Sequence, residues 1–191
     1  GRVFGRPEWI DSARRALEFI RNHMWKDARL LATAKDERAH LPAYLDDYAF
    51  LADAALELVQ WRFDAGVLSF GCELLEALIA RFSDTERGGF FFTSSDHEQL
   101  MNRPKSYSDE ALPSGNGVAA VTLQRYGWLL AEPRYLTAAE QVLRGAWQEM
   151  NEHNVNHATL AQALEEYLQP PVVIVIRGAL ADIAAWQRQL Q

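Results

Sequence analysis

The sequence predicts a mainly α-helical protein that forms part of an α/α toroid, in which buried inner helices alternate with one-sided outer helices. Apolar residues recur every three or four positions along most of the 191 residues. Helices that are apolar on one face alternate with helices that are apolar nearly all round. The one-sided helices that contain Ile10, Leu68 and Leu136 also share a weak repeat, which indicates stacked helical hairpins. A plain α-solenoid is the competing architecture, because periodicity alone does not separate the two.

The helices follow from their apolar spacing, taken in chain order. Pro7 suits the first turn of a helix, and Ile10 and Leu17 follow on one face. The helices with few charges, which we expect to be buried on most sides, cover about 45–62 and 116–131. The one-sided helices are expected over about 10–24, 67–82, 134–150 and 157–168. A last helix is expected over 179–190.

Two stretches interrupt the helical pattern. Aromatic residues in 88–93 and the segment 100–105 flank a polar turn, which predicts a β-hairpin over about 88–105. Prolines and Gly178 bound the β-branched run 172–176, which predicts a short buried strand. We therefore expect residues 1–170 to form the partial toroid and residues 171–191 to form a strand–helix extension.

Composition narrows the class of function. The net charge of −7 argues against binding to a nucleic-acid backbone, which needs a basic face. The sequence has no apolar run long enough to span a membrane. Cys72 is the single cysteine, which fits a reducing compartment and predicts a cytoplasmic location. The motifs that bind nucleotides or redox cofactors are absent, so no cofactor is expected.

No metal site is expected either. His153 and His157 are four residues apart, a spacing that can hold a metal on one helix face. The residues between them supply no acid, and the pair straddles the start of the predicted helix 157–168. Surface or capping histidines are the favoured interpretation.

The candidate site lies where loops enter the inner helices. In an alternating arrangement these loops meet at one end, and the loop over about 83–115 is the longest of them. Asp47 and Asp109 precede the two inner helices and form a candidate catalytic pair, because glycoside hydrolysis uses two carboxylates. The candidate ligand-binding residues are Asp46, Tyr48, Arg103, Lys105, Ser114 and Asn116.

Each candidate also has a structural interpretation. Asp46 and Asp47 suit a helix N-terminus, where carboxylates cap backbone N–H groups. Ser114 or Asn116 suits the same role at the second inner helix. Arg103 and Lys105 suit a solvated turn, whereas the functional interpretation has the arginine pair with Asp109 or a bound anion.

Four motifs occur in order and together resemble a known family. They are Leu45-Asp46-Asp47-Tyr48-Ala49-Phe50-Leu51, Gly88-Gly89-Phe90-Phe91, Arg103-Pro104-Lys105 and Pro113-Ser114-Gly115-Asn116-Gly117-Val118-Ala119-Ala120. The chain is similar from about residue 6 to residue 176 to the thioredoxin-domain-containing family of spermatogenesis-associated protein 20 and its bacterial relatives. Glu110 stands where many members have glycine, and Gly117 stands where serine is frequent.

This resemblance implies features that the residue pattern does not show. Family members carry an N-terminal thioredoxin-like domain followed by a six-hairpin α/α toroid similar to glycosidases and N-acylglucosamine 2-epimerases. The chain resembles the later part of that toroid, without the thioredoxin-like domain. The link to carbohydrates rests on fold analogy.

Two functions remain open at this point. The first is a domain that binds or acts on a sugar-like small molecule at the loops entering the inner helices. The second is a non-catalytic toroid scaffold that binds a protein or peptide partner next to a redox domain. A closed toroid needs more helices than this length supplies, so we expect an open arc. Its exposed apolar flanks predict self-association, or docking to missing parts of the parent chain.

Overall fold

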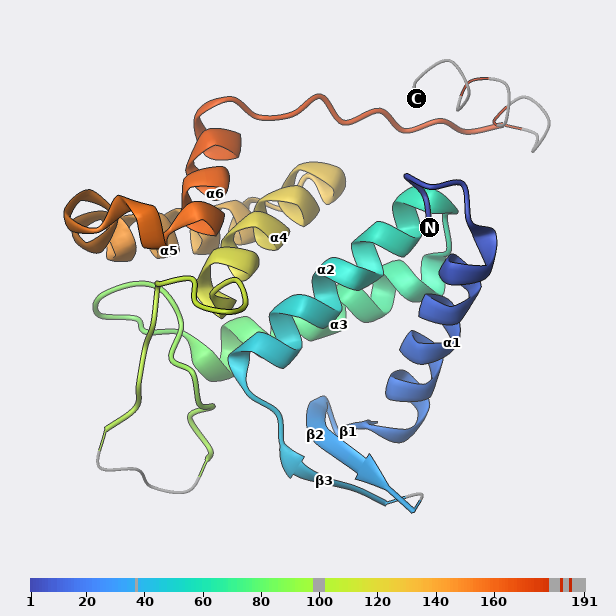
Figure 1. Cartoon of the computed structure of the whole chain (residues 1–191), viewed down its shortest axis with the longest axis horizontal. Coiled ribbons are helices and arrows are strands. Elements are labelled where there is room, and N and C mark those ends of the chain that lie inside the picture. The colour runs from blue at the N-terminus through green and yellow to red at the C-terminus, as the bar shows by residue number, and fades with distance from the viewer. Residues whose placement is uncertain (37, 98–101, 179–182, 184–185, 187–191) are drawn as a thin grey trace.

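The computed structural model describes residues 1–36, 38–97, 102–178, 183 and 186. These residues form six α-helices and a small antiparallel sheet (Figure 1). The elements are α1 Pro7–His23, β1 Trp25–Lys26, β2 Arg29–Lys35, β3 Arg38–Pro42, α2 Leu45–Trp61, α3 Ala65–Phe82, α4 Gly115–Leu130, α5 Pro133–Glu152, the 3₁₀ turn Asn154–Asn156 and α6 Ala158–Leu168. The helices expected over 1–170 are therefore confirmed, with ends that shift by a few residues.

The helices pack in a regular order. α2 packs against both α3 and α4, and α4 also packs against α5 and α6 (Figure 1). The nearly apolar helices α2 and α4 are therefore neighbours, as their burial pattern predicts. Among the described residues, none of the helices has the length and apolar character needed to cross a bilayer.

Local capping sets where the helices begin. The Asp64 carboxylate accepts hydrogen bonds from the backbone N–H groups of Gly66 and Val67 at the start of α3. The Ser114 hydroxyl accepts from the N–H of Gly117 at the start of α4. Because both caps fix a helix start, they also fix where the loops that precede these helices can end.

The core lies between α2, α3 and α4. Phe70 and Phe82 of α3 and Tyr126 of α4 are fully buried there. The Tyr126 hydroxyl donates to the carbonyl of Ala52 at 3.2 Å, so it joins α4 to α2. A side chain at Gly71 would collide with the Tyr126 hydroxyl. Glycine at position 71 therefore allows α3 to approach this tyrosine.

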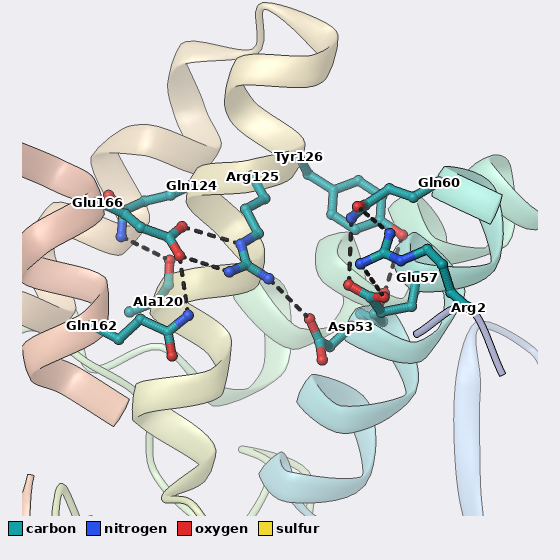
Figure 2. A network of polar contacts seen from close by, with 11 residues as sticks. Arg2, Asp53, Glu57, Gln60, Ala120, Gln124, Arg125, Tyr126, Gln162 and Glu166 are labelled. Carbon is teal, nitrogen blue, oxygen red and sulfur yellow. Dashed lines mark hydrogen bonds and ion pairs between the residues drawn. The ribbon is translucent and has the colours of Figure 1, made fainter. Parts of the chain in front are cut away.

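A charged network joins the three helices α2, α4 and α6 (Figure 2). Arg125 of α4 donates two hydrogen bonds to Glu166 of α6, at 2.6 and 3.1 Å, and lies 4.0 Å from Asp53 of α2. The Glu166 hydrogen bond raises the pKa of Arg125, and burial raises the pKa of Asp53. One arginine thus balances two half-buried carboxylates from two neighbouring helices.

The structure contains a three-stranded sheet that the sequence pattern does not predict. β2 pairs antiparallel with β1 and with β3, and Thr33 stands opposite His40. The turn between β1 and β2 places Asp27 and Ala28 at positive φ, of 51° and 55°. Such turns are recognised by Asn-Gly or Asp-Gly, and an alanine at the second position removes that signal.

The hairpin predicted over 88–105 is wrong for the residues that the structure describes there, 88–97 and 102–105. They contain no regular strand, although Phe90 forms a bridge with Ser83 and the N–H of Phe92 donates to Pro104. Phe92 also accepts from the N–H of Leu45. The segment therefore bonds to the ends of α3 and α2 and, through Phe92 and Pro104, between its own two sides, but its described residues form no regular strand.

The buried strand predicted over 172–176 is also wrong. The segment 171–177 is extended without a strand partner among the described residues, and Val172, Ile174 and Val175 are exposed. A run of branched apolar residues predicts a strand only if a neighbouring strand supplies hydrogen bonds. The helix predicted over 179–190 lies outside the described residues, apart from positions 183 and 186.

Candidate functional site

A cavity of about 320 Å³ opens beside the first turns of α2 and α4. We call it the site cavity. Its lining comes from those two turns and from the long segment between α3 and α4: Leu45, Asp46, Phe92, Ser106, Ser108, Glu110, Ala111, Leu112, Pro113, Ser114, Gly115 and Asn116. Its volume lies at the small end of the range for ligand pockets, which fits a molecule of monosaccharide size.

Asp46 supplies one carboxylate of the site cavity. It lies in the first turn of α2, where the helix dipole favours negative charge. A side chain at Gly115 would collide with the Asp46 carboxylate, so this group lies directly against the start of α4. Burial, and then the charge of Asp47, raises the pKa of Asp46. The carboxyl therefore takes up a proton more readily than an exposed aspartate.

Glu110, an exposed residue, also lines the site cavity, together with serines that carry neutral hydroxyls. Ser106 and Ser108 line the same wall, and the Ser108 hydroxyl lies 3.4 Å from Nε2 of His157. Phe92 supplies an aromatic surface and is stacked on Tyr44 with ring centroids 4.6 Å apart. The site cavity thus combines hydrogen-bonding oxygens with an aromatic face.

Asn116 lines the site cavity, but the polar atoms of its side chain are bonded to the long segment between α3 and α4. Its side chain is buried, and Oδ1 accepts from the N–H of Phe90 at 2.8 Å. Its Nδ2 donates to the carbonyls of Phe90 and Ser106, at 2.9 and 3.0 Å. These contacts fasten two separate parts of the long segment to the first turn of α4.

Asp109 does not line the site cavity. Its Oδ1 accepts from the N–H of Ser114 and its Oδ2 accepts from the N–H of Thr159, both at 2.8 Å. The first bond lies at the start of α4 and the second at the start of α6. Asp109 therefore joins two helix N-termini, where backbone N–H groups need acceptors.

The other candidates from the sequence also lie outside the lining. Asp47 is exposed and accepts from the N–H of Tyr44 at 2.8 Å, which is the predicted capping role. Tyr48 is buried, and its hydroxyl accepts from the N–H of Leu30 at 2.8 Å. The structure therefore brings Asp46, Ser114 and Asn116 together and places the remaining five candidates elsewhere.

Lys105 and Arg103 are held within the long segment rather than in a solvated turn. The Lys105 ammonium bonds Asp84 at 2.7 Å and the carbonyl of Gly88 at 2.9 Å. Burial alone would raise the pKa of Asp84, but the bonds from Lys105 and from two backbone N–H groups outweigh it and lower this pKa. Arg103 lies 4.2 Å from the centre of the Phe91 ring and donates to the carbonyl of Thr93.

His153 and His157 lie between α5 and α6. His153 is exposed, as the prediction of a surface location requires, whereas His157 is buried at the N-cap position of α6 and makes no capping hydrogen bond through its side chain. Its Nδ1 lies 2.8 Å from the carbonyl of His153. In the described part of the chain, no group of three or more histidine, cysteine or acidic side chains is arranged to hold a metal ion.

Glu110, Ser106, Ser108 and Phe92 line the site cavity without being among the predicted ligand contacts. The length of the segment 83–115 was the signal that located them, because long loops in compact domains carry function. The sequence does not show which side chains of such a loop face inward, since that depends on anchors such as Asn116.

The comparisons with known proteins give a distant relationship. No family model matches the chain. It is 26% identical over 189 residues to spermatogenesis-associated protein 20 of Homo sapiens, which covers 93% of this chain and 24% of that protein. The protein of the same name from Rattus norvegicus gives the same values. An uncharacterized protein of Caenorhabditis elegans is 25% identical over 179 residues, covering 90% of this chain and 24% of that protein.

The chain is therefore distantly homologous to spermatogenesis-associated protein 20 over most of its length. It spans about a quarter of the length of the curated relatives it matches.

Proposed function

We propose that the chain is part of a carbohydrate-processing type of α/α toroid and that the site cavity binds a sugar-like small molecule. The packing order supports the first half of this proposal, because α2, α4 and α6 follow one another while α3 and α5 pack on their flanks. In a toroid these would be the inner and outer helices. The distant homology to spermatogenesis-associated protein 20 supports a shared architecture over most of the chain.

The observation that carries the binding proposal is the composition of the site cavity. Two carboxylates and three serines provide acceptors and donors for sugar hydroxyls, and Phe92 provides a face for stacking. If the domain is an enzyme, Asp46 and Glu110 are better placed as acid and base than Asp47 and Asp109, because only the first pair lines the site cavity. The raised pKa of Asp46 suits a proton donor.

A panel of neutral and charged monosaccharides tests the binding proposal through the melting temperature of the protein. We expect at least one sugar to raise the melting temperature in a concentration-dependent way, because a ligand that binds only the folded state stabilises it. Gly115→Ala should abolish this rise, since the added methyl group pushes the Asp46 carboxylate out of its place against α4. NMR spectra of the same mixtures would show whether any sugar is converted.

Gly178→Ala is the matched control, because a side chain there meets only open space. It should bind the sugar as the unaltered protein does. The binding proposal is wrong if no sugar in the panel changes the melting temperature, or if Gly115→Ala binds as well as the control.

The exposed apolar segment 172–175 favours a second candidate function, as a scaffold that associates with another copy of the chain. Val172 is 87% exposed and Val175 61% exposed, and the extended backbone between them has free hydrogen-bonding groups among the described residues. Two such segments can pair antiparallel, which satisfies both backbones and covers both apolar rows.

Sedimentation velocity at increasing protein concentration tests this association. We expect dimers that are lost in the double variant Val173→Lys with Ile174→Lys, because symmetric pairing would bring like charges together. Val155→Lys changes a valine that is 85% exposed and lies outside the segment, and it should leave the dimer intact. A protein that stays monomeric at every concentration would contradict the scaffold candidate.

A further inference from the structure

We infer that the site cavity selects an amine-bearing, cationic sugar-like molecule over neutral and acidic counterparts. This inference rests on the proposed binding function and names the class of ligand. It starts from the charge of the lining, which includes Asp46 and Glu110 but no lysine, arginine or histidine. The ionisable residues of the lining are therefore both acidic, and the lining contains no cation to balance them.

Two cationic side chains of the long segment already bond other groups of the protein. Lys105 bonds Asp84, whose side chain is buried, and also bonds the carbonyl of Gly88. Arg103 lies over the ring of Phe91 and donates to backbone carbonyls of Arg81 and Thr93. Moving either side chain to an acidic ligand would leave its present partners without a donor, which costs free energy.

The start of α4 does not offset the negative lining. A helix N-terminus ordinarily attracts anions through its free N–H groups and its dipole. Here the Asp109 carboxylate accepts from the N–H of Ser114, and the Ser114 hydroxyl accepts from the N–H of Gly117. The Asp46 carboxylate lies against Gly115, where an anionic ligand would have to come. An acidic ligand that approaches the start of α4 would therefore face this carboxylate.

An ammonium group fits the same surroundings. It carries three N–H donors, and the lining offers carboxylate and hydroxyl oxygens at Asp46, Glu110 and Ser106. Half-buried Asp46 has a raised pKa because burial disfavours its charge, and a nearby cation would restore the charged form. The net charge of −7 on the whole chain also attracts cations during diffusion.

Three matched monosaccharides test the inference by titration calorimetry at low salt: glucosamine, glucose and glucuronic acid. Each charged sugar differs from glucose in one group, an ammonium at C2 in glucosamine and a carboxylate at C6 in glucuronic acid. We expect glucosamine to bind about tenfold more tightly than glucose, and glucuronic acid to bind more weakly than glucose. In the double variant Asp46→Asn with Glu110→Gln, the ratio of glucosamine to glucose affinity should fall towards one.

Glu152→Gln is the control for overall charge, because it removes one exposed carboxylate at the end of α5 and leaves the cavity unchanged. It should keep the preference for glucosamine. The charge inference fails alone if glucose binds and glucosamine has no advantage, or if the double variant keeps the full preference. Both the inference and the proposed function fail if none of the three sugars binds.

Discussion

Asn116→Ala should destabilise the protein by about 3–4 kcal/mol, the largest single effect that we expect at the site. The side chain is 1% exposed and makes three hydrogen bonds to backbone groups of Phe90 and Ser106. Alanine would remove all three bonds and leave the N–H and C=O of buried Phe90 without their side-chain partner. Each group left in this way costs about 1–3 kcal/mol, and relaxation of the loop recovers part of the sum.

Urea denaturation followed by circular dichroism measures this loss directly. Asn151→Ala provides the control, because Asn151 is exposed and its amide makes one bond to the carbonyl of Trp147 within the same helix. It should change the free energy of unfolding by about 0.5 kcal/mol or less. Equal effects of the two variants would mean that Asn116 does not anchor the long segment.

The anchoring role explains why the sequence predicts the helices better than the long segment. Helices such as α3 depend on apolar spacing and on a nearby cap at Asp64, both of which are local. The path of residues 83–114 depends on contacts between distant residues, such as Asn116 with Phe90. The chain also takes positive φ angles at Gly88 and Gly89, where the predicted hairpin would begin.

The sequence does not predict the sheet, and it predicts the C-terminal segment wrongly, for related reasons. The β1–β2 turn uses Ala28 at a positive φ, which no residue preference would suggest. The run 172–176 has the composition of a buried strand, but composition does not show whether a partner strand is present. In both cases, whether a strand forms depends on pairing with another strand, and such pairing leaves no pattern among neighbouring residues of the sequence.

At the candidate site the sequence identifies adjacent pairs of acids but not the member that faces the cavity. In Asp46-Asp47, the second residue bonds the N–H of Tyr44 and the first lines the site cavity. In Asp109-Glu110, the first residue bonds two backbone N–H groups and the second lines the site cavity. In each pair, one carboxylate accepts hydrogen bonds from backbone N–H groups at a helix start, and the neighbouring residue lines the site cavity.

Asp109 bonds helix starts rather than lining the site cavity, and its substitution should give the second large loss of stability. Asp109→Asn should destabilise the protein by about 2–3 kcal/mol, since the carboxylate accepts charge-assisted bonds from Ser114 and Thr159. Asparagine keeps one acceptor oxygen, but its NH₂ group would face an N–H donor and could not accept from it. One of the two helix starts, α4 or α6, would therefore lose its contact with this residue.

Chemical denaturation and sugar binding together separate this structural role from a catalytic one. A structural Asp109 predicts a loss of stability, with weaker ligand binding that is restored when the protein is kept fully folded by low temperature. A catalytic Asp109 predicts unchanged stability and a loss of turnover alone. Glu110→Gln is the matched comparison, because Glu110 is exposed and lines the site cavity without bonding either helix start. It should change the free energy of unfolding little while altering ligand preference, which is the reverse of the pattern expected for Asp109→Asn.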